Sequence, residues 1–139
     1  MLRVRSPLCS PKTEKTVLIV DDDLGFAFWL GQALDRAGFQ TWPARSVASA
    51  ESLLQEMKLR VDLLLIAASL PQAHDFAARM ESFHSDLKVI AVYDDIDRVV
   101  EQFARDGAVR QKPQSIDSAM ESDWVKLVAD ILVNKLRLQ

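Results

Sequence analysis

Three consecutive aspartates, Asp21 to Asp23, directly follow a short β-branched run at 16–20. Acids crowded in this way repel one another, so a cation is expected nearby, either a divalent metal ion or a lysine. Magnesium is usually held by one or two carboxylates, with waters and a phosphate completing its octahedron. An equally simple interpretation is that Asp22 and Asp23 cap the following helix and complement its dipole. The spacing alone leaves both interpretations open.

The elements that must position these acids alternate between strand-like and helix-like patterns. Short apolar or β-branched runs predict strands at 16–20, 39–44, 61–67, 87–93 and 109–112. Helices are predicted from the aspartates to a capping Gly38, and then over 46–57, 76–84, 97–108 and 118–136. Pro43 cannot donate a hydrogen bond to a ladder, which assigns the second strand to a sheet edge.

This alternation predicts an α/β fold, a flavodoxin-like doubly wound parallel sheet of five strands in the order 2-1-3-4-5, with helices on both faces. In that order a ligand site is expected beyond the carboxyl ends of strands one and three.

Helical periodicity predicts which side chains face the sheet. On the first helix the inward stripe comprises Phe26, Leu30, Ala33 and Ala37. Ser46 is expected to cap the second helix, whose inner face comprises Val47, Ala50, Leu53 or Leu54, and Met57. The last helix is expected to bury Trp124, Leu127 or Val128, and Ile131.

The composition excludes several classes of function. The chain has 139 residues, which suits one domain at 16–139 after an N-terminal arm at 1–15 that is expected to be flexible. A net charge of −3 offers no basic footprint for nucleic acid. No apolar run is long enough to span a membrane. The single cysteine, Cys9, cannot form a disulfide within the chain and fits a reducing, cytoplasmic location.

The ordered set of motifs resembles the receiver domain of two-component response regulators. The segments that carry the resemblance are VLIVDDD, AGFQTWPA, VDLLLIAASLP, LKVIAVYDD, and DGA followed by KP. They span roughly residues 16 to 136. The resemblance implies the five-stranded fold described above. It also implies transfer of a phosphoryl group from a histidine kinase to an aspartate at the end of the third strand, with magnesium held beside it.

Three residues match the signature of that family. Asp21 and Asp22 correspond to its paired metal-binding acids, and Lys112 corresponds to the lysine that pairs with the phosphoryl group. Without a phosphoryl group, Lys112 is expected to lie against Asp21 or Asp22. The alternative is that Lys112 is now an ordinary solvated surface lysine.

Three other signature positions depart from the family. The phosphoacceptor position is Ala67, whose methyl group cannot attack phosphorus. The hydroxylic switch position is Tyr93, and the aromatic switch position is Val109. With one carboxylate lost, only a weak magnesium site is expected at Asp21 and Asp22.

We therefore expect a pseudo-receiver, not an enzyme, that acts as a phosphorylation-independent interaction or dimerisation module. Its partner would be another protein, such as a histidine kinase or an output protein, or a second copy of the chain. One alternative is a phosphoaccepting domain that uses a displaced acid, Asp22 or Asp75. The other is a regulatory domain that binds a small ligand in the same pocket.

The partner surface is expected on apolar arcs of the first and last helices that exceed what one sheet face needs. Its predicted members are Phe28, Trp29, Val125, Leu132 and Leu136. Exposed apolar patches often mark binding sites, and the last helix is the favoured surface. The alternative is that these side chains pack against one another.

Overall fold

A computed structural model describes residues 15–84, 86–94, 108–113 and 117–133. Nearly all of the predicted arm at 1–15 and of the predicted helix at 97–108 lies outside the described residues, as does the end of the predicted last helix. No described helix has the length and apolar character needed to cross a membrane.

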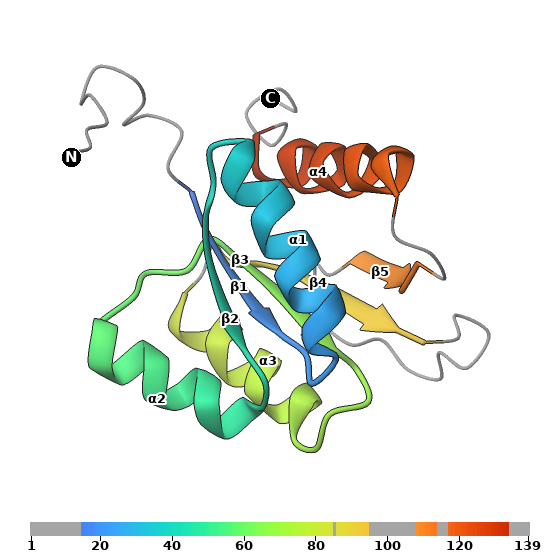
Figure 1. Ribbon diagram of the computed structural model, residues 1–139. Coiled ribbons are helices and arrows are strands. Elements are labelled where there is room, and N and C mark those ends of the chain that lie inside the picture. Colours follow the sequence, from blue (N-terminus) through green and yellow to red (C-terminus); the bar gives the residue numbers. More distant parts are fainter. Residues whose placement is uncertain (1–14, 85, 95–107, 114–116, 134–139) are drawn as a thin grey trace.

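Five parallel strands form one sheet in the order β2-β1-β3-β4-β5 (Figure 1). The strands are β1 (Thr16–Val20), β2 (Gln40–Ala44), β3 (Leu63–Ala67), β4 (Lys88–Tyr93) and β5 (Ala108–Gln111). The predicted fold class and strand order are therefore confirmed, with strand ends shifted by at most two residues.

Four described helices cover the sheet: α1 (Leu24–Arg36), α2 (Val47–Met57), α3 (Ala73–Phe83) and α4 (Ser118–Val133). The helices α1 and α4 lie on one face of the sheet, and α2 and α3 lie on the other (Figure 1). Local chemistry explains several of the helix ends. Ser46 caps α2 by accepting a hydrogen bond from the Ser49 amide at 3.0 Å, as predicted. Gly38 follows α1 with a φ of 102°, a conformation that glycine adopts without strain.

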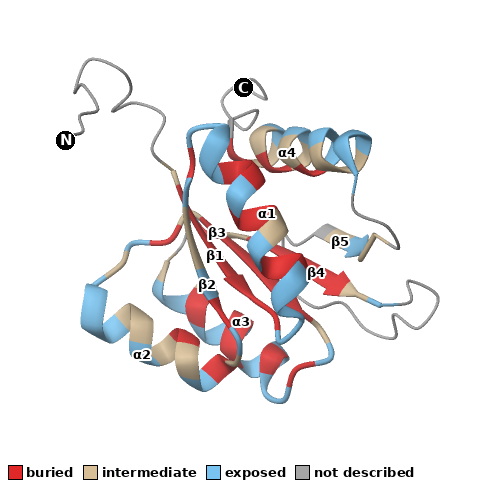
Figure 2. Ribbon diagram, viewed as in Figure 1, coloured by how far each residue is buried: buried red, intermediate tan, exposed pale blue. Residues whose placement is uncertain are grey.

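The two central strands, β1 and β3, divide their side chains between two apolar layers. The layer under α2 and α3 contains Leu18, Val20, Leu64 and Ile66. The layer under α1 and α4 contains Val17, Ile19, Leu63 and Leu65. Burial on both faces explains why these strands read as continuous apolar runs rather than as alternating ones (Figure 2).

The predicted helix faces are partly wrong. Ala37 is exposed because α1 ends at Arg36, and Met57 is 49% exposed because it ends α2. In α4 the buried stripe is Trp124, Val128 and Leu132, spaced four residues apart, so Ile131 is only half-buried. The helix α3 begins at Ala73, which is earlier than predicted. Its N-cap residue, Gln72, makes no side-chain capping bond, so the sequence carries no capping signal for this start.

The position of β2 at the sheet edge is confirmed, and Pro43 lies where its missing N–H is harmless. The Gln40 amide donates to the Lys15 carbonyl, and the Ala44 carbonyl accepts from the Asp21 amide. Because backbone directions alternate along a strand, Thr41 and Pro43 direct their backbone groups away from β1.

Candidate acidic pocket

The predicted site lies at the carboxyl edge of the sheet and centres on Asp21. This residue directly follows β1, and its own backbone N–H extends the ladder to Ala44. Its side chain is buried, and its Oδ1 accepts a hydrogen bond from the Asp23 amide at 2.9 Å. The backbone therefore fixes the direction of this carboxylate before any partner binds.

Lys112 supplies the cation for the pocket. It directly follows β5, and its backbone N–H donates to the Tyr93 carbonyl at 2.8 Å. Its Nζ donates to Asp21 Oδ1 at 3.3 Å and lies 3.2 Å from Oδ2. The second contact is an ion pair without hydrogen-bond geometry, so Oδ2 accepts no hydrogen bond. The predicted pairing with Asp21 is present, and the interpretation of Lys112 as a solvated surface lysine is wrong, since its side chain is 16% exposed.

Two further acids complete the surroundings of Lys112. Its Nζ lies 3.5 Å from Asp23 Oδ2 and 3.6 Å from Asp94 Oδ1. The predicted alternative partner, Asp22, is exposed and is not among the ion-pair partners described for Lys112. Asp23 also caps α1 by accepting from the Phe26 amide at 3.2 Å, so the capping interpretation holds for this residue.

The ammonium also contacts the core between α1 and α4. Lys112 Nζ lies 5.3 Å from the centroid of the Phe26 ring, within cation–π range. Phe26 in turn makes an edge-to-face contact with Trp124, with centroids 5.4 Å apart. Through Phe26, the charge cluster is attached to the packing of both helices.

Burial and charge act in opposite directions on this pair. Burial raises the pKa of the Asp21 carboxyl and outweighs the opposing effects of the Asp23 amide and the Lys112 ammonium. For Lys112, burial lowers the pKa, but attraction to Asp21, with help from Asp23 and Asp94, outweighs it and leaves the pKa raised. Both residues therefore bind their protons more firmly than in water. Burial disfavours the charged form of Asp21, whereas the ion pair stabilises the charged form of Lys112.

The end of β3 offers no oxygen from its side chain. Ala67 is the last residue of the strand and is 3% exposed. The Ala68 amide donates to the Val92 carbonyl at 2.8 Å, which holds the start of the following loop against β4. Tyr93 ends β4 and Val109 lies in β5, and both are half-buried.

Comparison of structures identifies the fold. A CheY-like response regulator receiver domain protein from Methanospirillum hungatei JF-1 superimposes with a TM-score of 0.68 at 15% identity, covering 91% of this chain and 99% of that one. A response regulator from Thermotoga maritima gives a TM-score of 0.68 at 20% identity, covering 86% of this chain and 98% of that one. This chain has the receiver fold. No protein-family model and no curated protein matches its sequence.

A third structure with the receiver fold carries a metal. The response regulator TrrA from Thermotoga maritima, in complex with Mg²⁺ and BeF, superimposes with a TM-score of 0.66 at 17% identity, covering 85% of this chain and 99% of that one. The described residues of the present chain include no group of three His, Cys, Asp or Glu that could hold a metal ion. Both oxygens of Asp21 face Lys112, and β3 ends in a methyl group. The weak magnesium site predicted at Asp21 and Asp22 stays a prediction: a cation there would compete with Lys112 for Asp21 and would find no third carboxylate at the end of β3.

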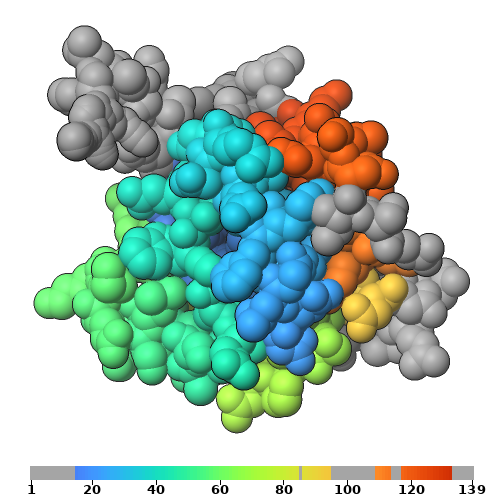
Figure 3. Space-filling model, in the orientation of Figure 1, coloured from blue at the N-terminus to red at the C-terminus, as the bar shows by residue number. Residues whose placement is uncertain are grey.

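The predicted partner surface is only partly available on this receiver fold. Phe28 on α1 is 54% exposed, whereas Trp29 and Val125 are half-buried against the layer between α1 and α4. Leu132 is a wrong prediction because it completes the buried stripe of α4, and Leu136 lies outside the described residues. Figure 3 shows α1 in blue across the centre of this face, with α4 in orange beside it.

Sequence reasoning missed two members of the pocket, Asp23 as a partner of Lys112 and Asp94. A signal was present, because both follow strands whose carboxyl ends meet at one edge of a parallel sheet. Reading the acids after β1 and β4 together, as one cluster around a single lysine, would have found them.

Proposed function

We propose that this chain is a receiver-like signalling domain of the two-component type that binds a protein partner without accepting a phosphoryl group. The observation that carries the proposal is Ala67, buried at the end of β3, with Lys112 already paired to Asp21. The resemblance places the phosphoacceptor at this position and assigns the phosphoryl-pairing role to Lys112.

The chemistry supports this proposal directly. Phosphoryl transfer to a protein needs a lone pair on the attacking atom, and the Ala67 methyl group has none. The displaced acids of the alternative interpretation, Asp22 and Asp75, are both exposed, and neither is among the ion-pair partners described for Lys112. A phosphoryl group on either acid would therefore lack the lysine that the family uses.

The absence of switch residues argues for a constitutive interaction. In the family a small hydroxylic side chain moves toward the phosphoryl group while an aromatic ring turns inward. Tyr93 and Val109 occupy those positions here, and neither can repeat the paired movement. A domain without this switch would present the same surface at all times, to a histidine kinase, an output protein or a second copy of itself. We propose a binding role and not catalysis.

Labelling with small phosphodonors tests the proposal. The wild-type chain is incubated with acetyl phosphate or phosphoramidate and magnesium, and intact mass is recorded before and after hydroxylamine. We expect no adduct. A stoichiometric, hydroxylamine-labile adduct would overturn the proposal, and its loss in Asp22→Asn or Asp75→Asn would identify the acid responsible. A ligand thermal-shift signal that Lys112→Ala abolishes would instead favour the small-ligand alternative.

A further inference from the structure

Lys112 connects segments that lie far apart in the sequence. Asp21 directly follows β1, Asp94 directly follows β4, and Lys112 directly follows β5. The lysine Nζ lies 3.2 Å from Asp21 Oδ2, 3.5 Å from Asp23 Oδ2 and 3.6 Å from Asp94 Oδ1. One ammonium group thus serves three carboxylates, and no other cation pairs with them in the part of the chain that the structure describes.

The distances around the Lys112 Nζ suit an ammonium group better than a small divalent ion. Magnesium binds oxygen at about 2.0–2.1 Å, so an ion at the position of Nζ would need each of the three carboxylate oxygens to move inward by about 1 Å or more. Asp21 is the least free to move, because its side chain is buried and its Oδ1 accepts from the Asp23 amide at 2.9 Å. The carboxylates are therefore spaced for the group that already lies between them.

This cation is covalently attached, so its presence does not depend on the ions in solution. A group on a short flexible tether acts at an effective concentration on the order of millimolar. The start of this tether is itself fixed, since the Lys112 amide donates to the Tyr93 carbonyl at 2.8 Å. At the far end, Nζ lies 5.3 Å from the centroid of the Phe26 ring, in cation–π contact. A divalent ion must displace this preplaced ammonium before it reaches Asp21.

We propose that the Lys112 ammonium is the resident cation of the acidic pocket and takes the place of a divalent metal, so that Lys112 and a divalent ion compete for Asp21. The proposal rests on the function proposed above and specifies how that site is kept in one state. A built-in cation would hold the ends of β1, β4 and β5 in one arrangement whatever the magnesium concentration. The interaction surface would then be constant as well.

Magnesium titration of the wild type and of Lys112→Met tests this competition, with isothermal calorimetry as the measurement of affinity. Removing the ammonium leaves the carboxylates without their counter-charge. The exposed Asp22, Asp23 and Asp94 can then turn toward an ion that keeps most of its waters. We expect Lys112→Met to bind magnesium at least tenfold more tightly than the wild type.

Thermal unfolding, followed by circular dichroism, gives a second readout. An ion that binds only the folded state stabilises that state. Magnesium at ten times the dissociation constant of Lys112→Met should therefore raise the melting temperature of this variant by about 5 °C. The same concentration should raise that of the wild type by no more than about 2 °C. Sodium chloride at equal ionic strength is the control for general screening of charge.

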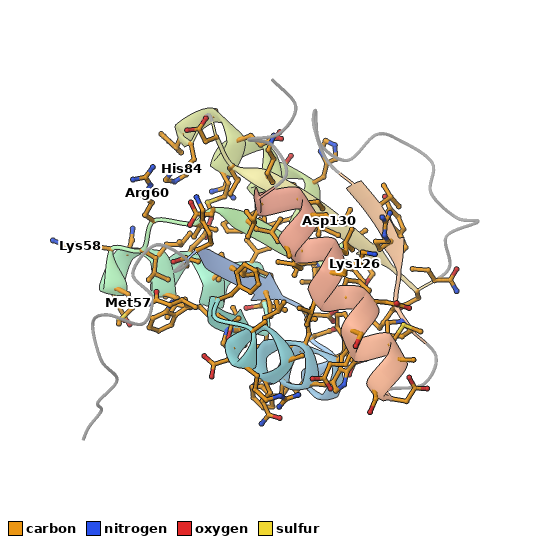
Figure 4. All side chains as sticks on the ribbon, turned by 90° about the horizontal axis from the view of Figure 1, so that it is seen from above. Met57, Lys58, Arg60, His84, Lys126 and Asp130 are labelled. Carbon is orange, nitrogen blue, oxygen red and sulfur yellow. The ribbon has the colours of Figure 1, made fainter. Side chains whose placement is uncertain are left out.

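Three further variants localise the effect. Lys126→Met removes a lysine from the exposed side of α4, outside the acidic pocket (Figure 4), and should leave magnesium binding unchanged. Asp21→Asn/Lys112→Met also removes the buried acid and should lose most of the gain. Lys112→Gln removes the charge but keeps a hydrogen-bond donor for Asp21, so it repeats the test if Lys112→Met does not fold.

Equal magnesium affinity of the wild type and the uncharged variants, including no measurable binding by any of them, would overturn the proposal. A gain that persists in Asp21→Asn/Lys112→Met would also overturn it, because the ion would then not compete for Asp21. These titrations contain no phosphodonor, which separates them from the test of the proposed function. A hydroxylamine-labile adduct contradicts the proposed function, whereas equal affinities contradict only the competition with Lys112.

Discussion

Replacing Lys112 with methionine removes the ammonium while keeping a flexible side chain of similar length. Asp21, whose side chain is 2% exposed, then keeps only the Asp23 amide as a hydrogen-bond donor. We expect this substitution to destabilise the fold, because a buried carboxylate loses its counter-charge.

The magnitude follows from how far the pair is buried. Removing one partner of a fully buried ion pair costs about 3–5 kcal/mol. Lys112 is 16% exposed, and two of its three acidic partners, Asp23 and Asp94, are exposed, so we expect about 2 kcal/mol of the unfolding free energy to be lost. For a chain of this length, that loss lowers the melting temperature by about 8 °C.

Urea unfolding, followed by tryptophan fluorescence and circular dichroism, measures this loss. Asp21→Asn/Lys112→Met is the decisive comparison, because it removes both charges and should recover most of the lost stability. The coupling between the two substitutions should be about 1–2 kcal/mol. The loss in Lys112→Met should also shrink toward acid pH, where Asp21 takes up a proton. The role of Lys112 as the permanent counter-charge of Asp21 would be refuted by either of two results. One is a Lys112→Met variant as stable as the wild type, and the other is a double variant no more stable than Lys112→Met.

Three further predictions concern the same edge of the sheet. Ala67→Asp should raise magnesium affinity above that of the wild type in calorimetric titration, because it adds a carboxylate at the end of β3, beside Asp21 at the end of the neighbouring strand β1; unchanged binding would count against the pocket. Asp23→Ala should lower the free energy of unfolding in urea by about 1 kcal/mol because it removes the cap of α1, whereas Asp23→Asn can still cap the helix and should lose little stability. Equal losses in the two variants would assign the effect to the charge of Asp23 instead. Because burial raises the Asp21 pKa above 3.8, the folded state holds this proton more firmly than the unfolded state. The stability of the wild type relative to Asp21→Asn should therefore fall as the pH rises above about 4, and a rise would contradict the sign of the shift.

The sequence predicts the fold well because its strongest signals are local and agree with one another. The continuous apolar run of β3 requires burial on both faces, and Pro43 excludes β2 from the interior of the sheet. Ser46 and Gly38 mark helix ends through chemistry that depends on little beyond their own turns. Such features do not depend on how distant segments pack.

Features set by tertiary packing could not be predicted in the same way. Whether Ile131 or Leu132 faces inward depends on the rotation of α4 against α1, which helical periodicity does not determine when both positions are apolar. Met57 lies on the correct stripe but is exposed, since α2 leaves the sheet after its first turns. A groove of about 740 Å³ between α2 and α3 follows from that departure, so no single motif predicts it.

The proline at the sheet border limits how this domain can assemble. Along the outer side of β2, the N–H of Thr41 is present but that of Pro43 is missing, which interrupts the row of donors that another chain would need for strand addition. Continuous sheets across molecules are therefore disfavoured at this border. We therefore expect complexes made at this border to depend mainly on side-chain contacts, which can change one residue at a time without altering the backbone.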